Sequence, residues 1–342
     1  MLTLSDFDYN LPKELIAQYP ADKRDASRMM VIDRKTGKIS HEKFIDFPSY
    51  IKKGDIVVLN DTKVTNVRLI GRRRTGGRTE IFLTEKVEDN KFKALLKPSS
   101  RIREGDEVIF DDSKLKAWII TKKEANNIVE FRCHGGNVGE ELTRIGSVPL
   151  PPYVKRSAEP LDKDRYQTVY AKREGATAAP TAGLHFTEKT LDEITLKGTK
   201  LAYMTLHVNY GTFAPVKTED ITKHKMHSEE FELSKSAADD INNVKKNGGK
   251  IFAVGTTAVR VLEMCAVGGN VEARSGKTDI FIYPPYEFKM VDVLLTNFHF
   301  PKSTLLMLVN AFAGRELMLK AYDEAIRERY RFFSYGDCML II

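Results

Sequence analysis

The chain has 342 residues, of which 42% are hydrophobic and 30% are charged, as is typical of a folded protein. No apolar run reaches the ~18 residues that a membrane span needs, and this excludes a transmembrane protein. The 54 basic and 47 acidic residues give a formal net charge of +7. A mildly basic balance permits a polyanionic partner without requiring one.

Three cysteines, Cys133, Cys265 and Cys338, are far apart and form no CxxC pair. This spacing favours a reducing cytoplasm and argues against a zinc–cysteine site. The first ten residues contain an early acidic residue and no basic stretch, so they predict no signal peptide. The length predicts two domains and a large core.

Residues 1–64 have a mixed pattern, which predicts a short helix over 12–18, a hairpin of 29–33 with 38–44, and a strand over 55–59. Between residues 66 and 133, short runs of alternating apolar residues are separated by turns rich in Gly, Asn and Asp. The predicted strands are 67–71, 79–84, 92–96, 107–110, 116–121 and 128–132. Strands at this spacing predict a small antiparallel sandwich or barrel. The Pro-rich segment 148–153 is expected to be the extended exit from it.

From about residue 156 onward, predicted strands alternate with predicted helices. The predicted strands are 200–206, 250–254, 278–283, 291–296 and 339–342. One predicted helix begins after Thr187, and the others span 236–244, 258–266, 304–313 and 316–331. This alternation predicts an α/β layer with a mostly parallel sheet.

The run 179–187 (Ala-Pro-Thr-Ala-Gly-Leu-His-Phe-Thr) places His185 on a bend of small residues just before a helix. Thr187 is a favourable N-cap residue, and the first N–H groups of a helix attract negative charge. The run therefore predicts a ligand pocket that includes Thr181 and His185. A tight turn with a packed histidine is the alternative interpretation.

Three other predicted strand ends carry similar residues. These are His207 with 211–212, Thr256 and Thr257 with Arg260, and Asn297 with His299 and Ser303. Ligands bind beyond the carboxyl ends of strands in an open α/β sheet, so we expect these groups to form one site. A guanidinium such as that of Arg260 is suited to hold a carboxylate.

His227 and Glu229 are two residues apart, which predicts an acid/base pair. A metal site with His224 is less favoured, because the histidines lack the i, i+4 spacing of a zinc helix and no third ligand follows. No dinucleotide fingerprint, Walker motif or GxSxG elbow occurs.

Four arginines, Arg72, Arg73, Arg74 and Arg78, surround a Gly-Gly turn at 76–77. One interpretation is a solvated hairpin tip. The other is contact with the phosphates of a nucleic acid.

Taken together, these strings resemble the S-adenosylmethionine:tRNA ribosyltransferase-isomerase family of queuosine biosynthesis. The resemblance runs nearly end to end and includes Phe7-Asp8-Tyr9 and Leu59-Asn60-Asp61-Thr62. Its other strings lie at 15–18, 24–28, 149–153, 165–170, 179–187, 206–207, 211–213, 226–229, 255–257 with Arg260, 278–283, 296–305, 311–316 and 330–340.

The resemblance implies an α/β main domain of residues 1–64 and 150–342, interrupted by a β-barrel domain of residues 65–149. It also implies transfer and isomerisation of the ribosyl group of S-adenosylmethionine onto the 7-aminomethyl-7-deazaguanine wobble base of tRNA. Epoxyqueuosine-tRNA forms, and adenine and methionine leave. S-adenosylmethionine is then a consumed co-substrate. No true cofactor and no metal are expected, and we expect a cytoplasmic monomer that binds the anticodon stem-loop.

This chemistry requires a base near the sulfonium, an acid near adenine and an anchor for the methionine carboxylate. We hypothesise that His185 or His299 is the base and that Arg260 is the anchor. His227 with Glu229 would be a second acid/base pair. Asp279 or Asp61 would bind the guanine-like edge.

For the RNA, the arginine turn is expected to act with Lys155, Arg156 and residues 327–331. The chain departs from the family at Asn209-Tyr210, where a glycine-containing pair is usual, at Ala258, where Ser is common, and at Phe300, where Leu is common. A tRNA methyltransferase, a non-enzymatic RNA-binding module and a metal-dependent hydrolase are the alternative functions.

Overall fold

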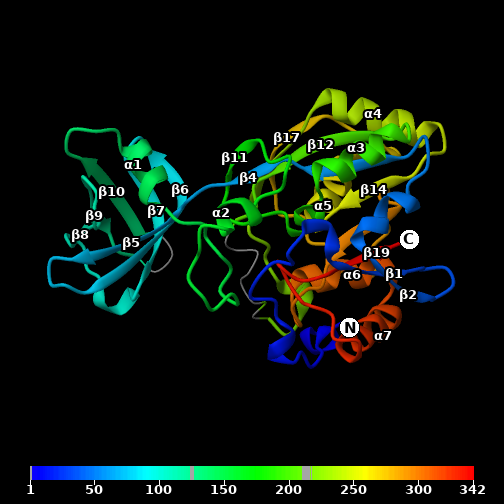
Figure 1. Ribbon diagram of the computed structural model, residues 1–342, viewed down its shortest axis with the longest axis horizontal. Coiled ribbons are helices and arrows are strands. Elements are labelled where there is room, and N and C mark those ends of the chain that lie inside the picture. The colour runs from blue at the N-terminus through cyan, green and yellow to red at the C-terminus, as the bar shows by residue number, and fades with distance from the viewer. Residues whose placement is uncertain (1, 124–126, 210–215, 217) are drawn as a thin grey trace.

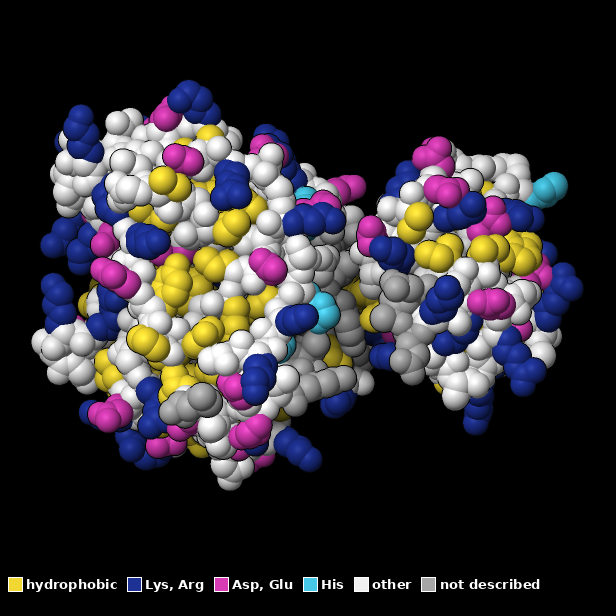
Figure 2. Space-filling view, turned by 180° about the vertical axis from the view of Figure 1, so that it is seen from behind, with side chains coloured by type: hydrophobic (Ala, Val, Ile, Leu, Met, Phe, Trp, Pro, Cys, Tyr) yellow, Lys and Arg dark blue, Asp and Glu magenta, His cyan; other side chains and the backbone are white. Residues whose placement is uncertain are grey.

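The computed structural model describes residues 2–123, 127–209, 216 and 218–342. It has two lobes joined at a narrow waist (Figures 1 and 2). One lobe is built on a nine-stranded sheet and the other on a closed six-stranded barrel. The predicted combination of an α/β part with a small antiparallel barrel is confirmed.

The nine-stranded sheet has the order β17-β13-β12-β3-β14-β18-β19-β1-β2. Its strands are β1 Arg28–Ile32, β2 Ile39–Lys43, β3 Ile56–Asn60, β12 Lys200–Leu206, β13 Glu229–Leu233, β14 Ile251–Val254, β17 Arg274–Thr278, β18 Val293–Asn297 and β19 Cys338–Ile341. The prediction of a mostly parallel sheet is wrong for the described strands, because only the pairs β12–β3, β3–β14, β14–β18 and β19–β1 are parallel. Antiparallel neighbours can be joined by a short connection, as β1 and β2 are at one edge, whereas β17 pairs antiparallel with β13 at the other edge although β14 lies between them in the chain.

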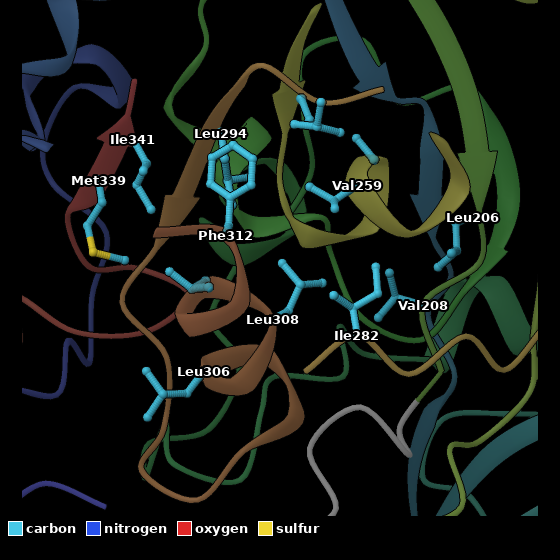
Figure 3. Close-up of a cluster of buried hydrophobic side chains, with 14 of the residues drawn as sticks. Leu206, Val208, Val259, Ile282, Leu294, Leu306, Leu308, Phe312, Met339 and Ile341 are labelled. Carbon is cyan, nitrogen blue, oxygen red and sulfur yellow. The ribbon is translucent and has the colours of Figure 1, made fainter. Parts of the chain in front are cut away.

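The middle of the sheet is buried on both faces. In β3, Ile56 and Val58 belong to one hydrophobic cluster, whereas Val57 and Leu59 belong to another. Successive side chains of a strand point to opposite faces, so this segment reads as a continuous apolar run. Figure 3 shows the first cluster, in which Leu308 and Phe312 of α6 (Thr304–Ala313) lie near Leu294 of β18.

The other α-helices have the bounds α1 Val138–Ile145, α2 Asp162–Arg165, α3 Glu188–Leu196, α4 Lys235–Lys246, α5 Thr256–Met264 and α7 Arg315–Arg327. The 3-10 turns are η1 Leu4–Phe7, η2 Lys13–Leu15, η3 Arg24–Ala26, η4 Phe44–Tyr50, η5 Ser99–Arg101, η6 Thr181–His185 and η8 Ile221–Lys223. Thr187 caps α3 as predicted, because its hydroxyl accepts a hydrogen bond from the Thr190 N–H at 3.1 Å.

The barrel has the order β10-β7-β6-β5-β8-β9 and is closed. Its strands are β5 Arg68–Arg73, β6 Arg78–Glu88, β7 Lys91–Lys97, β8 Glu107–Ile109, β9 Leu115–Thr121 and β10 Asn127–Cys133. It has its own hydrophobic cluster, which includes Leu69, Ile81 and Phe131. Where the chain enters and leaves the barrel, the backbones of Arg68 and Ser147 pair with each other.

Three predicted elements differ from the observed ones. Residues 12–18 form only the turn η2, because Ile16 becomes extended and pairs with Phe332. Of the predicted strand 278–283 only Thr278 belongs to a strand, as the last residue of β17, and Phe281 and Tyr283 pack against the main core beyond it. The predicted helix 316–331 stops at Arg327, since Arg329 has a left-handed backbone conformation (φ +54°) and Tyr330 packs into the core.

Besides the strand β13 and the short helix α2, four short strands and the helix α1 were not predicted. The strands form two small pairs, β4 Thr62–Val64 with β11 Arg173–Ala176 and β15 Ala266–Val267 with β16 Asn270–Val271. These strands are two to four residues long, which is too short for an alternation of apolar and polar residues to indicate them. The helix α1 has a clear N-cap signal, since the side chain of Asn137 accepts a hydrogen bond from the Glu140 N–H.

Candidate active site

A cleft lies at the carboxyl ends of β14 and β18, and we call it the main cleft. It is lined by residues 179–182, Val208, residues 255–257, residues 296–300, Ser303 and Leu305, with Tyr153, Phe333 and Ser334. Three of the four groups that the sequence predicts to converge therefore do so, and the exception is the group of His207. Thr181, Thr256, Thr257, His299 and Ser303 all lie in this cleft.

His299 is the histidine that lines the main cleft, and its position is tightly defined. Its Nε2 is 2.9 Å from the Thr296 hydroxyl, its N–H donates to the Tyr322 hydroxyl at 2.9 Å, and its carbonyl accepts from the Tyr9 hydroxyl. Burial lowers the pKa of His299 to about 3, so the ring is neutral at pH 7. The neutral imidazole keeps a nitrogen lone pair that can accept a proton, and the lowered pKa makes it a weak base while the cleft holds no ligand.

His185 lies outside the lining of the main cleft, because its ring points into the core against Phe44, with the ring centroids 5.4 Å apart. The residue is 3% exposed. Burial lowers its pKa to about 4, and a hydrogen bond with the side chain of Asn297 opposes this shift. Asn297 itself lines the cleft and donates through Nδ2 to the carbonyl of Phe333 at 3.0 Å. His185 thus contacts a cleft residue from behind.

The lowered pKa of His185 leads to a prediction about how the stability of the protein depends on pH. An unfolded histidine has a pKa near 6.5 and His185 a folded pKa of about 4, so the unfolded state binds the proton first as the pH falls. The contribution of the neutral His185 side chain to the free energy of unfolding is complete above pH 6.5 and is lost as the pH falls towards 4. His185→Gln should therefore reduce the difference in unfolding free energy between pH 7 and pH 4 by about 3 kcal/mol.

Urea unfolding at both pH values measures this difference. An unchanged difference in the variant would show that His185 has the same pKa in the folded and the unfolded protein, and that burial does not lower it.

Arg260 and Glu229 form a buried ion pair behind the first turn of α5. Arg260 is 3% and Glu229 2% exposed, and the second carboxylate oxygen of Glu229 accepts the Asn209 N–H at 3.0 Å. The Nε and Nη2 atoms of Arg260 have no hydrogen-bond partner among the described residues. Glu229 is thus joined to Arg260, whereas His227, its predicted partner, is exposed.

His207 lies in a second cleft, between the barrel and the edge of the main sheet. Its Nδ1 is 2.8 Å from the Thr62 hydroxyl, and burial lowers its pKa. Glu85 and Lys86 of the barrel line the same cleft. In extended backbone, adjacent side chains point in opposite directions, so Val208 lines the main cleft and His207 does not.

The two candidate aspartates lie apart from the main cleft. Asp61 is 8% exposed and accepts a hydrogen bond from the Thr205 hydroxyl at 2.6 Å. Asp279 is exposed, directly after β17. Ser303 is in the cleft, but its hydroxyl caps α6 by accepting from the Leu306 N–H at 3.2 Å. The catalytic and binding roles hypothesised for all these residues stay predictions.

The arginine turn is the β5–β6 hairpin, and its members have different surroundings. Arg72, Arg73 and Arg74 lie within 4 Å of Asp111, Asp106 and Glu107 respectively. Arg78 makes no ion pair with any residue in the described ranges. It lines a groove between the barrel and the segment 147–158, together with Lys97 and Lys155.

The positions that depart from the family resemblance are in three different places. Phe300 lines the main cleft, Asn209 lines the second cleft, and Ala258 is buried in α5. Tyr210, with Gly211 and Thr212, lies outside the described residues.

Sequence reasoning missed Phe333, which lines the main cleft with a left-handed backbone (φ +73°). No sequence pattern indicates a left-handed backbone at Phe333, because residues with this conformation are usually Gly or Asn.

In the part of the chain that the structure describes, no group of three or more His, Cys, Asp and Glu side chains is placed to hold a metal ion. Over the same ranges, no helix combines the length and the apolar character that a bilayer span requires. Cys133, Cys265 and Cys338 are all free thiols.

An α/β lobe with a cleft at the carboxyl ends of its strands has the architecture of a ligand-binding α/β protein. Residues 4–341 match the model of the queuosine biosynthesis protein family. The chain therefore belongs to this family and is an enzyme, as the sequence resemblance predicts.

Its relatives cover the whole chain. It is 52% identical to the S-adenosylmethionine:tRNA ribosyltransferase-isomerase of Acetivibrio thermocellus, over 99% of this chain and 100% of the relative. It is also 52% identical to the enzyme of the same name from a Sulfurihydrogenibium species, over 100% of both chains. The crystal structure of an S-adenosylmethionine tRNA ribosyltransferase from Thermotoga maritima is similar, with a TM-score of 0.57 and 38% identity over 99% of this chain and 100% of that one.

Proposed function

We propose that the chain transfers the ribosyl group of S-adenosylmethionine to the 7-aminomethyl-7-deazaguanine wobble base of tRNA and isomerises it there. Epoxyqueuosine-tRNA is the product, and adenine and methionine leave. One observation carries the proposal: in a member of this family, the main cleft brings His299, Thr181 and the start of α5 to one place.

His299 is the proposed base. The sulfonium acidifies the C5′ hydrogens of the ribosyl group, and the neutral imidazole accepts one of these protons. The electron pair on C5′ forms a double bond to C4′ as the C4′–O4′ bond breaks, and the released O4′ pair forms a carbonyl at C1′ and expels adenine. The amine of the tRNA base then attacks the sugar, and methionine departs as the epoxide closes. Because Thr296 holds Nε2, Nδ1 is the atom assigned to exchange the proton.

The start of α5 is the proposed anchor for the methionine carboxylate. The first N–H groups of a helix bind anions, and here they follow Gly255 at the floor of the cleft. The hydroxyl oxygen of Thr257 is buried without a hydrogen-bond partner among the described residues. Arg260 lies one turn further on and is paired with Glu229, so we assign it the positioning of this turn rather than the direct contact.

A single reaction tests the proposal. Purified protein is mixed with S-adenosylmethionine and tRNA that carries the aminomethyl-deazaguanine base, and free adenine and tRNA mass are measured. Adenine release that matches the gain of the rearranged ribosyl group supports the proposal. Adenosylhomocysteine would identify a methyltransferase, and tRNA binding without any product would identify a binding module. Activity lost with a chelator would favour the metal-dependent hydrolase.

We also propose that the tRNA lies in the groove between the barrel and residues 147–158. Arg78, Lys97 and Lys155 are exposed along this groove, where no acidic side chain pairs with Arg78 or Lys97 among the described residues. On this proposal, residues 65–149 act as an inserted barrel domain, and 1–64 with 150–342 as the catalytic domain. The protein works as a monomer without a resident cofactor. It works in the cytoplasm, and its three free thiols support this location because the cytoplasm keeps thiols reduced.

The groove predicts a specific salt dependence. Each lost phosphate contact should reduce the slope of log K against log salt by about 0.7 to 0.9. Lys97→Ala and Arg78→Ala should each flatten the slope by this amount. Arg72→Ala is the matched control on the same hairpin, since Arg72 has Asp111 as a neighbour at 3.9 Å. Filter binding of tRNA at several salt concentrations measures the slope. Equal effects of Arg72→Ala and Arg78→Ala would place the RNA on the hairpin tip instead.

A further inference from the structure

One wall of the main cleft is aromatic. The rings of Phe300 and Phe333 are stacked, with their centroids 3.6 Å apart and their planes at 21°. Tyr153 packs against both rings, at 5.0 Å from each. Phe333 and Tyr153 are buried, at 3% and 8% exposure, whereas Phe300 is only partly buried. Phe300 is therefore the member of this wall that a ligand in the cleft can reach most readily.

The support behind Phe300 is rigid. Phe333 has a left-handed backbone (φ +73°), which is unfavourable for a bulky residue and persists only where the surroundings hold it. Its carbonyl accepts hydrogen bonds from the Asn297 side chain and from the Gly336 N–H, both at 3.0 Å. The Tyr153 hydroxyl is hydrogen-bonded to Ser334. The stack is thus fixed before any ligand arrives.

Other parts of the cleft differ from this wall in character. Ala179, Pro180, Ala182 and Gly255, which are small or compact, line the same cleft. Thr257 contributes a buried hydroxyl oxygen that has no partner within the described ranges. Aromatic stacking with hydrogen-bonding groups nearby is how proteins bind unpaired bases.

We propose that Phe300, supported by Phe333 and Tyr153, is a stacking subsite for a planar purine-like base in the main cleft. The inference rests on the proposed function, which supplies two such bases: the adenine of S-adenosylmethionine and the deazaguanine of the tRNA. The aromatic wall carries no charged side chain, so the methionine part of S-adenosylmethionine is held elsewhere in the cleft.

The test compares Phe300→Leu with the wild type and with Phe288→Leu. Leucine keeps an apolar side chain but removes the stacking face. Phe288 is the matched control, because it is also a partly buried aromatic residue packed against the main core, and it lies outside the main cleft. Phe300→Tyr keeps the ring and should retain the wild-type values. Thermal unfolding of each variant shows whether it is folded.

Calorimetric titration with S-adenosylmethionine and with free methionine gives the first readout, and the KM for tRNA gives the second. If adenine stacks on Phe300, Phe300→Leu weakens S-adenosylmethionine binding about tenfold and leaves methionine binding unchanged. If deazaguanine stacks there, the KM for tRNA rises about tenfold instead. Unchanged values for both substrates, or equal changes in Phe288→Leu, would overturn the subsite. A wild-type protein that binds S-adenosylmethionine but releases no adenine would overturn the proposed reaction. The calorimetric titrations would then test the stacking subsite by themselves.

Discussion

His299→Ala is expected to lower kcat for adenine release by about 10²- to 10⁴-fold, the range that a positioned general base contributes. The reason is geometric: His299 is the histidine in the lining of the main cleft, and Tyr9, Thr296 and Tyr322 fix both its backbone and its ring. Single-turnover adenine release, with S-adenosylmethionine and tRNA both saturating, measures the effect on the chemical step.

Two control variants separate a catalytic role from a structural one. His185→Gln alters a histidine that is equally buried but lies behind the cleft, so its effect on kcat should be much smaller. Thr296→Val removes the hydroxyl that holds Nε2 of His299 and should reduce kcat while leaving the unfolding midpoint near the wild-type value. A His299→Ala protein that retains near-normal turnover would exclude this residue as the base.

The sequence predicted the elements that carry their own signals. The strands of the barrel were found because their apolar residues alternate between turns, and α3 was found because Thr187 marks its start. Sequence patterns did not indicate which distant segments of the chain pair with each other. Ile16 leaves a predicted helix because Phe332, more than three hundred positions later, offers its carbonyl to the neighbouring Ala17.

The same limit applies to the site. Motif spacing correctly grouped Thr181, Thr256, Thr257 and His299, since strand ends meet at one edge of a sheet. It did not separate His207 from this group, because one residue of shift in extended backbone turns a side chain to the other face. Nor did it reveal that Arg260 is opposed by Glu229, which lies on a strand that sequence patterns did not predict.

The Arg260–Glu229 pair is expected to dominate the stability of this region. Both groups are nearly inaccessible, so removing one leaves an uncompensated charge in the core, at a cost of about 3–5 kcal/mol. Arg260→Met and Glu229→Gln should each lower the unfolding free energy, because each removes one charge of a buried ion pair and leaves the opposite charge in place. Guanidinium unfolding at pH 7 measures both losses.

The double variant distinguishes a structural pair from a substrate anchor. Arg260→Met with Glu229→Gln leaves no buried charge, so its unfolding free energy should recover well above that of Arg260→Met. If Arg260 only positions the start of α5, the affinity for methionine should recover along with stability. If Arg260 contacts the methionine carboxylate directly, the folded double variant should still bind methionine at least tenfold more weakly, because the carboxylate has then lost a charged partner.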